Sequence, residues 1–187
     1  MRAICIILVM LPMFSLSRVT AKHENQRTAT AATAAAASDT ATVQLILSSE
    51  KLKYNRNDEI LLTAMVKNQS LRDVFIYGNL EWGYYASLTL CVRDAAGKEI
   101  PPNFIADAIT HFDNPEDSSQ FVKLLPFHFL GKAYNTSARR LNIQKPGTYS
   151  IYAEYHSPIS TSKVSIKPFW GKENGIVQSN TLTIEIE

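Results

Sequence analysis

The run from Pro146 to Tyr155 constrains the fold more than any other part of the chain. It opens with a Pro-Gly turn signal, and Leu141 and Ile143 lie just ahead of it. The residues after the turn alternate, so that one face of the segment carries Tyr149, Ile151, Ala153 and Tyr155. This pattern predicts a strand that is entered through a tight turn and has a tyrosine as its first core-facing residue.

Comparable segments recur from Val43 to Glu187. Short runs rich in apolar residues, most of them alternating, cover residues 43–47, 60–66, 74–77, 88–92, 121–129, 149–155, 163–167 and 181–187. Turn signals separate them, as is typical of an all-β sandwich. A tyrosine two residues ahead of a core position is typical of the tyrosine corner at the entry to strand F of an immunoglobulin-like sandwich. We therefore predict an immunoglobulin-like antiparallel β-sandwich, all-β, for residues 43–187.

The segment at residues 60–67 differs from the others because both of its faces are mostly apolar. Ile60, Leu62, Ala64 and Val66 alternate with Leu61, Thr63, Met65 and Lys67. Such a strand should lie centrally in its sheet.

The first 42 residues form no part of the predicted domain. A charged start, an apolar run to Leu16 and a short-side-chain end at Ala21 predict a cleaved signal peptide over residues 1–21. The alternative is an uncleaved membrane anchor, which the short run and Pro12 disfavour. Residues 22–42 are rich in Ala and Thr without a large apolar residue, so we expect a disordered linker. The predicted location is extracytoplasmic, either secreted or periplasmic.

The net charge of the mature sequence limits the classes of partner that we expect, and its cysteine content limits the possible disulfides. Cleavage after Ala21 removes Arg2 and Arg18, which leaves 17 of the 19 basic residues against 17 acidic ones. A near-neutral mature chain gives no electrostatic reason to expect nucleic acid, or a membrane after signal cleavage, as a partner. Cys91 is then the only cysteine, so no intrachain disulfide can form, and we expect it to be a small packing residue.

The order of elements resembles small immunoglobulin-like domains of secreted bacterial proteins, including the proteinase-inhibitor-like group and the accessory sandwiches of secreted peptidases. The resemblance is carried by Tyr54 with Asp58-Glu59-Ile60, Val66 to Ser70, Leu90 to Gly97, Leu125-Pro126, Pro146 to Tyr155 and Ser179-Asn180. In those domains a Gly commonly follows the Pro of the Leu-Pro turn, whereas Phe127 stands here. The resemblance implies inhibition of, or service to, a secreted peptidase as one possible function.

Catalytic and metal-binding patterns are weak. No G-x-S-x-G elbow occurs in the mature sequence. His111 and Asp113 could share an ion and so support a metal-dependent hydrolase, but an acidic solvated loop explains them better. We predict no catalytic residues, no metal site and no cofactor, and hence no enzyme.

Aromatic residues in two predicted loops are the stronger candidates for binding. The first loop carries Trp82, Tyr84 and Tyr85, and the second carries Phe169 and Trp170. Exposed aromatic rings stack on sugars or anchor protein partners, but the two Trp residues could instead plug the ends of the sandwich. We predict a non-catalytic binding or interaction module with an unidentified protein or glycan partner; carbohydrate-binding and proteinase-inhibitor-like modules are the alternatives. Asn68-Gln69-Ser70 and Asn135-Thr136-Ser137 match glycosylation acceptors.

Overall fold

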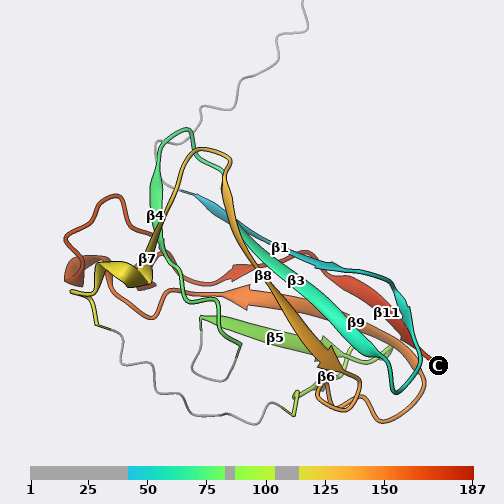
Figure 1. Ribbon diagram of the computed structural model, residues 1–187. Helices are drawn as coiled ribbons and strands as arrows, with labels where there is room; N and C mark the ends of the chain where they lie inside the picture. Colours follow the sequence, from blue (N-terminus) through green and yellow to red (C-terminus); the bar gives the residue numbers. More distant parts are fainter. Residues whose placement is uncertain (1–41, 83–86, 104–113) are drawn as a thin grey trace, which may run out of the picture. The chain divides into compact units, whose positions relative to one another are not determined.

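The computed structural model describes residues 42–82, 87–103 and 114–187, which form short strands joined by turns and 3-10 segments (Figure 1). The prediction of an all-β fold is confirmed. The predictions of a signal peptide at residues 1–21 and a linker at residues 22–42 fall on residues outside these ranges, apart from Thr42. Within them, no helix is long and apolar enough to cross a bilayer.

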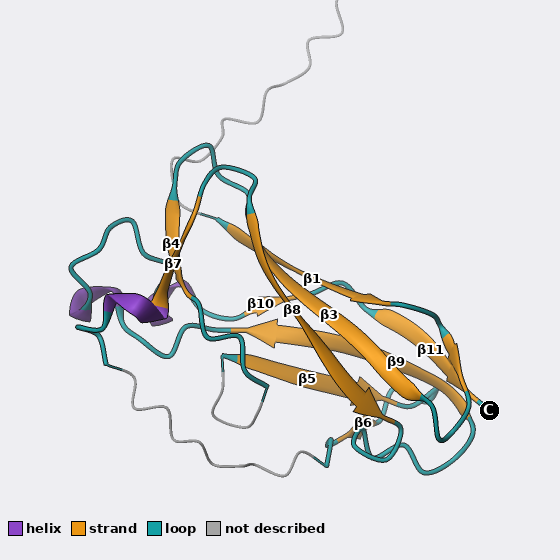
Figure 2. Cartoon of the chain, viewed as in Figure 1, coloured by secondary structure: helices purple, strands orange, loops and turns teal. Residues whose placement is uncertain are grey.

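Two sheets, antiparallel except for one short pair, make up the body of the domain (Figure 2). The first has the order β1–β3–β8 and consists of β1 (Val43–Ser49), β3 (Glu59–Asn68) and β8 (Phe129–Ser137). The second has the order β2–β11–β9–β5–β6 and consists of β2 (Lys53–Tyr54), β11 (Leu182–Ile186), β9 (Gly147–Tyr155), β5 (Leu88–Arg93) and β6 (Glu99–Ile100). A short strand, β10 (Val177–Gln178), also pairs with β9.

The order in which the chain visits the two sheets is that of an immunoglobulin-like sandwich. In that fold strands A, B and E form one sheet, and strands C, F and G belong to the other. Here β1, β3 and β8 take the places of A, B and E, and β5, β9 and β11 those of C, F and G. The parallel pair, β2 with β11, forms after the chain has crossed from the first sheet to the second. The predicted fold class is therefore confirmed.

Alternation along the strands builds the core between the sheets. Every second residue of β3 from Ile60 to Asn68 is buried, and β3 lies between β1 and β8 as its two apolar faces predict. The core-facing residues of β9, from Tyr149 to Tyr155, pack against the same cluster. Because the inner faces supply this apolar core, the outer faces and the loops are left for function.

A hydrogen bond closes the turn in front of β9. The hydroxyl of Tyr149 donates to the carbonyl of Lys145 at 2.7 Å, and the Tyr149 ring is buried. This contact confirms the predicted tyrosine corner.

Ser179 and Asn180 fasten the two sheets to each other. The Asn180 carboxamide accepts from the Leu47 amide and donates to the Leu47 carbonyl, both at 2.9 Å, on the open edge of β1. Ser179 accepts from the Ala153 amide on β9 through Oγ and donates to the Ala153 carbonyl through its own amide, again at 2.9 Å. Two adjacent polar residues thus join one sheet to the other.

Two predicted strands are corrected by the structure. The segment at residues 121–129 is not one strand: β7 (Phe121–Leu124) pairs with β4 (Val74–Tyr77), and a turn precedes β8, because Pro126 cannot donate to a ladder. Residues 163–167 form no strand. Lys163 ends a 3-10 turn at Thr161–Lys163, and the apolar side chains of the residues after it, Val164 and Ile166, join a second small core.

This second core lies beside the sandwich, at the level of β4 and β7. It consists of Tyr77, Phe121, Ile159, Val164 and Phe169, with Phe75 and Ile166 packed against them. The Glu173 carboxylate ties the 3-10 segments of this region together: it accepts from Ser160 Oγ, from Thr161 Oγ1 at 2.9 Å and from the Thr161 amide at 2.8 Å.

Replacing Tyr149 by Phe should lower the free energy of unfolding by about 1 kcal/mol, because it removes one hydrogen bond and leaves the ring packing intact. Urea unfolding measures this loss. An unchanged midpoint and slope would show that the corner contributes nothing to stability.

The stability that Glu173 provides should depend on pH. The hydrogen bonds from Ser160 and Thr161 lower the pKa of Glu173 to about 2 from an ordinary value of 4.5. The folded state thus binds a proton less readily than the unfolded state, so the contribution is present above pH 4.5 and is lost as the pH falls toward 2. Thermal unfolding of Glu173→Gln and the parent should therefore differ at pH 7 and converge near pH 2; a gap that stays constant with pH would contradict this role.

Candidate functional site

Trp82, the first predicted binding residue, packs against the main core of the sandwich. Its indole is half-buried and stacks on Tyr134 of β8, with ring centroids 4.0 Å apart and planes inclined by 9°. The Tyr134 hydroxyl donates to the carbonyl of Leu80, and Lys132 forms an ion pair with Glu81 on the same side. One face of the Trp82 ring is therefore covered by Tyr134.

The remaining predicted aromatic residues divide into two groups. Tyr84 and Tyr85 lie outside the described residues. Phe169 and Trp170 are only 6% and 9% exposed, and Phe169 packs edge-to-face on Phe121 with ring centroids 5.1 Å apart. The burial of Trp170 in the main core favours the alternative interpretation for that residue, in which it fills one end of the sandwich, and Phe169 belongs to the second small core.

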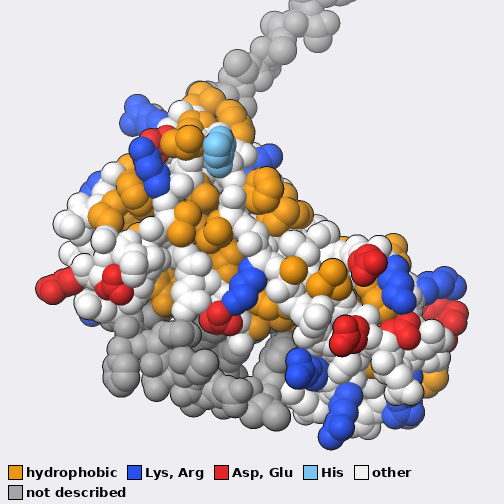
Figure 3. Space-filling view, viewed as in Figure 1, with side chains coloured by type: hydrophobic (Ala, Val, Ile, Leu, Met, Phe, Trp, Pro, Cys, Tyr) orange, Lys and Arg blue, Asp and Glu red, His pale blue; other side chains and the backbone are white. Residues whose placement is uncertain are grey.

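A different set of apolar side chains is exposed on the β3–β4 and β7–β8 loops and at the start of β8. We define the apolar tip as Leu71 in the β3–β4 loop, Leu125 and Phe127 in the β7–β8 turn, and Phe129 at the start of β8. Their side chains are 68%, 43%, 53% and 60% exposed, in that order. Figure 3 shows hydrophobic side chains gathered at the upper end of the molecule, where these loops lie.

The carboxamide of Asn68 holds the two loops of the tip together. Asn68 is the last residue of β3 and is fully buried. Its Nδ2 donates to the carbonyls of Arg72 at 2.7 Å and of Leu124 and Leu125 at 3.1 Å. Its Oδ1 accepts from the amide and hydroxyl of Ser70 at 2.9 and 2.7 Å. Every polar atom of the side chain is thus used to position the tip.

The same contacts bear on the first glycosylation acceptor. Transfer of a glycan requires an accessible Asn Nδ2, and that of Asn68 is buried and bonded to three carbonyls. In the folded chain this Asn-Gln-Ser sequence is therefore a structural element. Asn135, in the second acceptor, is exposed on β8.

Phe127 has a backbone conformation that usually requires Gly. The His128 amide donates to the Leu125 carbonyl at 3.0 Å and closes the turn, and Phe127 has φ = 62°. A non-Gly residue costs about 1–2 kcal/mol in this left-handed region. Because the ring is half exposed, burial does not offset this cost, and the turn instead presents the ring to solvent.

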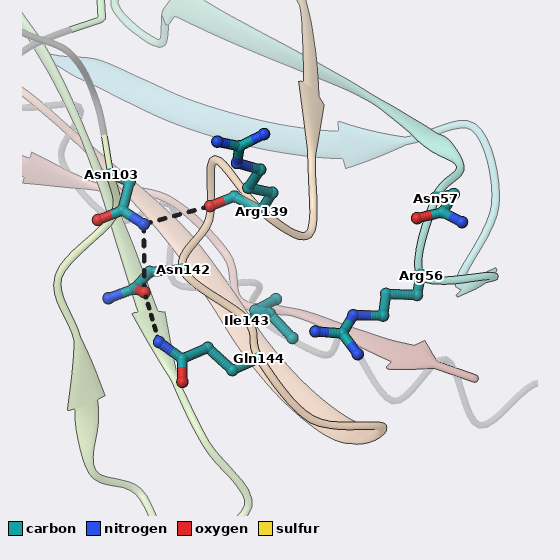
Figure 4. Close-up of a pocket in the computed structure, with 7 residues that line it drawn as sticks. All are labelled: Arg56, Asn57, Asn103, Arg139, Asn142, Ile143 and Gln144. Carbon is teal, nitrogen blue, oxygen red and sulfur yellow. Dashed lines mark hydrogen bonds between the residues drawn. The ribbon is translucent and has the colours of Figure 1, made fainter.

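A polar pocket of about 260 Å³ lies at the opposite end of β3. Its lining consists of Arg56, Asn57, Asn103, Arg139, Asn142, Ile143 and Gln144 (Figure 4). Asn142 Oδ1 accepts from Asn103 Nδ2 at 3.2 Å and from Gln144 Nε2 at 3.3 Å, so the amides largely satisfy one another. In Figure 4 the guanidinium groups of Arg56 and Arg139 point to different sides of the pocket. The pocket is therefore a weaker candidate than the tip.

The residues weighed for catalysis or metal binding give no site in the described part of the chain. Cys91 is buried, and desolvation raises the pKa of its thiol, which disfavours the reactive thiolate. His111 and Asp113 lie outside the described residues, and elsewhere no three metal-ligating side chains come together.

No protein-family model and no curated protein matches this chain. Among solved structures, the CARDB domain of a Pyrococcus furiosus protein, in complex with di-metal ions, is 11% identical with a TM-score of 0.37; the match covers 80% of this chain and 90% of that one. A β-glucosidase from Erythrobacter marinus is 13% identical with a TM-score of 0.37, over 79% of this chain and 16% of the enzyme. A β-glucosidase from Listeria innocua, in complex with glucose, is 10% identical with a TM-score of 0.37, over 78% of this chain and 16% of the enzyme. These scores add nothing to the strand topology, on which the fold assignment rests.

Replacing Asn68 by Ala should lower the free energy of unfolding by about 2–4 kcal/mol, because the buried carbonyl of Leu124 and the partly buried carbonyls of Arg72 and Leu125 lose their donor. Asn68→Asp, which keeps the shape but lacks the donor, should lose a similar amount. The matched control is Asn135→Ala on the exposed face of β8, where we expect a change within about 0.5 kcal/mol. Equal losses at Asn68 and Asn135 in urea unfolding would contradict the role of Asn68.

Proposed function

We propose that this protein is a secreted or periplasmic, non-catalytic interaction module that binds a protein partner through its apolar tip. One observation carries the proposal: three large apolar side chains are exposed on two loops that a buried Asn68 holds in place, and a fourth, Phe129, is exposed at the start of β8 beside them. Exposed apolar clusters rimmed by polar residues are typical of interaction surfaces.

The construction of the tip supports binding over chance exposure. A loop that is already fixed loses little conformational entropy on binding, so its apolar contacts contribute more fully to affinity. The left-handed backbone at Phe127 is a further indication, because strained conformations concentrate at functional sites. Phe127 and Phe129 provide the aromatic anchors that protein interfaces favour.

The charges around the tip indicate the chemistry of the partner. Three basic residues, Lys67, Arg72 and Lys123, flank the apolar residues. One acidic residue, Asp73, lies among these basic residues and forms an ion pair with Lys123 at 2.6 Å. A partner with an apolar cleft and an acidic rim would complement this arrangement.

Carbohydrate binding through the aromatic loops is the weaker alternative. Trp170 is buried, and one face of Trp82 is covered by Tyr134, which leaves little of either ring for a sugar. Proteinase inhibition is supported by the sequence resemblance alone, and a panel of secreted proteases assayed with the purified protein tests it.

Phe127→Gly should separate binding from stability. Glycine adopts φ = 62° without strain, and this gain roughly offsets its larger entropy loss on folding, so stability should stay the same or rise by up to about 1 kcal/mol. Loss of the aromatic anchor should weaken partner binding at least about tenfold. The partner is first identified by photo-crosslinking from position 127 in the native envelope, with position 98 as a distant exposed control.

The affinity of the identified partner is then measured for Phe127→Gly and the parent. Equal crosslinking from positions 127 and 98, or unchanged affinity of Phe127→Gly, would overturn the assignment of the tip as the binding surface.

A further inference from the structure

The outer face of the β1–β3–β8 sheet is an uncharged surface with several apolar side chains. Its outward residues between the two ends of β3 are Ile46 and Ser48 on β1, Leu61, Thr63 and Met65 on β3, and Gly131, Ala133 and Asn135 on β8. None of these described positions carries a charge. Solvent-facing sides of antiparallel sheets are ordinarily polar, so this composition requires an explanation.

Close packing makes the face continuous. Gly131 lies opposite Met65 in the strand register, and a Cβ at Gly131 would come within 3.0 Å of Met65 Cγ. The missing side chain therefore lets Met65 lie across β8 toward the exposed ring of Phe129. The result is an uncharged surface between Phe129 and Leu61, in which Ile46, Met65 and Leu61 are the large apolar residues and Ser48, Thr63 and Asn135 are the polar ones.

The two ends of this face carry charged residues of opposite sign. Lys67 stands at one end of β3, opposite Phe129, and Glu59 at the other, opposite Ser137. Thr63 lies midway, four residues from each. None of the ion pairs found in the described part of the chain involves Lys67 or Glu59.

We propose that this face binds a second copy of the chain, with the two β3 strands antiparallel across a two-fold axis at Thr63. In this arrangement Lys67 of each copy meets Glu59 of the other, Met65 meets Leu61, and the Thr63 residues meet at the axis. A two-fold axis along the strands would instead place Lys67 against Lys67, which like-charge repulsion disfavours. The charge pattern thus selects both the occupant and its orientation.

The dimensions of the face set the expected affinity. From Glu59 to Lys67 the strand is about 26 Å long at roughly 3.3 Å per residue, and the sheet is three strands wide at about 4.8 Å spacing. The resulting footprint of roughly 370 Å² is less than half of the about 800 Å² that each partner buries in a standard stable interface. We therefore expect a weak dimer that dissociates only in the high micromolar range. The face meets the tip at Phe129 and Lys67, whereas the tip residues Leu71, Leu125 and Phe127 lie in loops beyond the sheet.

Charge reversal tests the proposal by sedimentation velocity over about 5–500 μM protein, the range in which a weak dimer assembles. The parent should shift from monomer to dimer. Lys67→Glu and Glu59→Lys should each raise the dimer dissociation constant at least about tenfold, because each places two like-charge pairs across the axis. An equimolar mixture of the two variants should restore dimers, since both charged positions of one variant are then acidic and face the two basic positions of the other.

Lys98→Glu and Glu116→Lys are matched controls at exposed positions away from this face, and they should dimerise like the parent. Thr63→Arg, which places two cations at the axis, should remain monomeric while keeping the circular dichroism spectrum of the parent. A parent that stays monomeric throughout, single variants that dimerise normally, or a mixture that stays monomeric would each overturn the proposal.

Discussion

The buried carboxamide of Asn68 is the interaction on which the exposed end of this domain depends. It ends β3, fixes the β3–β4 loop through Ser70 and Arg72, and fixes the β7–β8 turn through the carbonyls of Leu124 and Leu125. Without it, only the flanking β3–β8 and β4–β7 ladders and the bond from the Asn68 amide to the His128 carbonyl would connect the two loops, and the apolar side chains of the tip would be freer to collapse onto the domain. The tip is thus an ordered surface because one polar group is buried beneath it.

Polar contacts of the same kind hold the sandwich itself. The described domain has a single, buried cysteine, so no disulfide joins its sheets. Instead Ser179 and Asn180 connect β9 to β1, and Tyr149 closes the turn into β9. These side chains satisfy backbone groups that the strand ladders leave open. The core can then consist of apolar residues, and the outer face of β1–β3–β8 and the tip remain as surfaces for recognition.

The alternation of apolar residues predicted the fold because most strands follow it. It failed where contacts with distant residues determine the local structure. The alternation in β3 and β9 identified their core faces, and the tyrosine at position 149 identified the corner. Residues 163–167 alternate as well, but Val164 and Ile166 pack into the second small core, a contact with distant residues that no local pattern reveals. The tip could not be predicted from the sequence for a similar reason. The sequence around Asn68 indicated a glycosylation acceptor, and the one sign of the strained turn was Phe127 at the position where related domains commonly have Gly. The sequence instead favoured the large aromatic residues of two loops as binding residues. Whether such a residue can bind a partner depends on its burial, which is set by the tertiary fold.

Backbone dynamics of the tip test most directly the claim that Asn68 makes it a rigid binding surface. The measurement is ¹⁵N relaxation of the amides of Ser70 and His128, which donate within the tip to Asn68 Oδ1 and to the Leu125 carbonyl. We expect order parameters of about 0.85 for both amides, equal to those of the β3 amides. Values below about 0.6 would show that the loops move independently and would contradict a pre-organised tip.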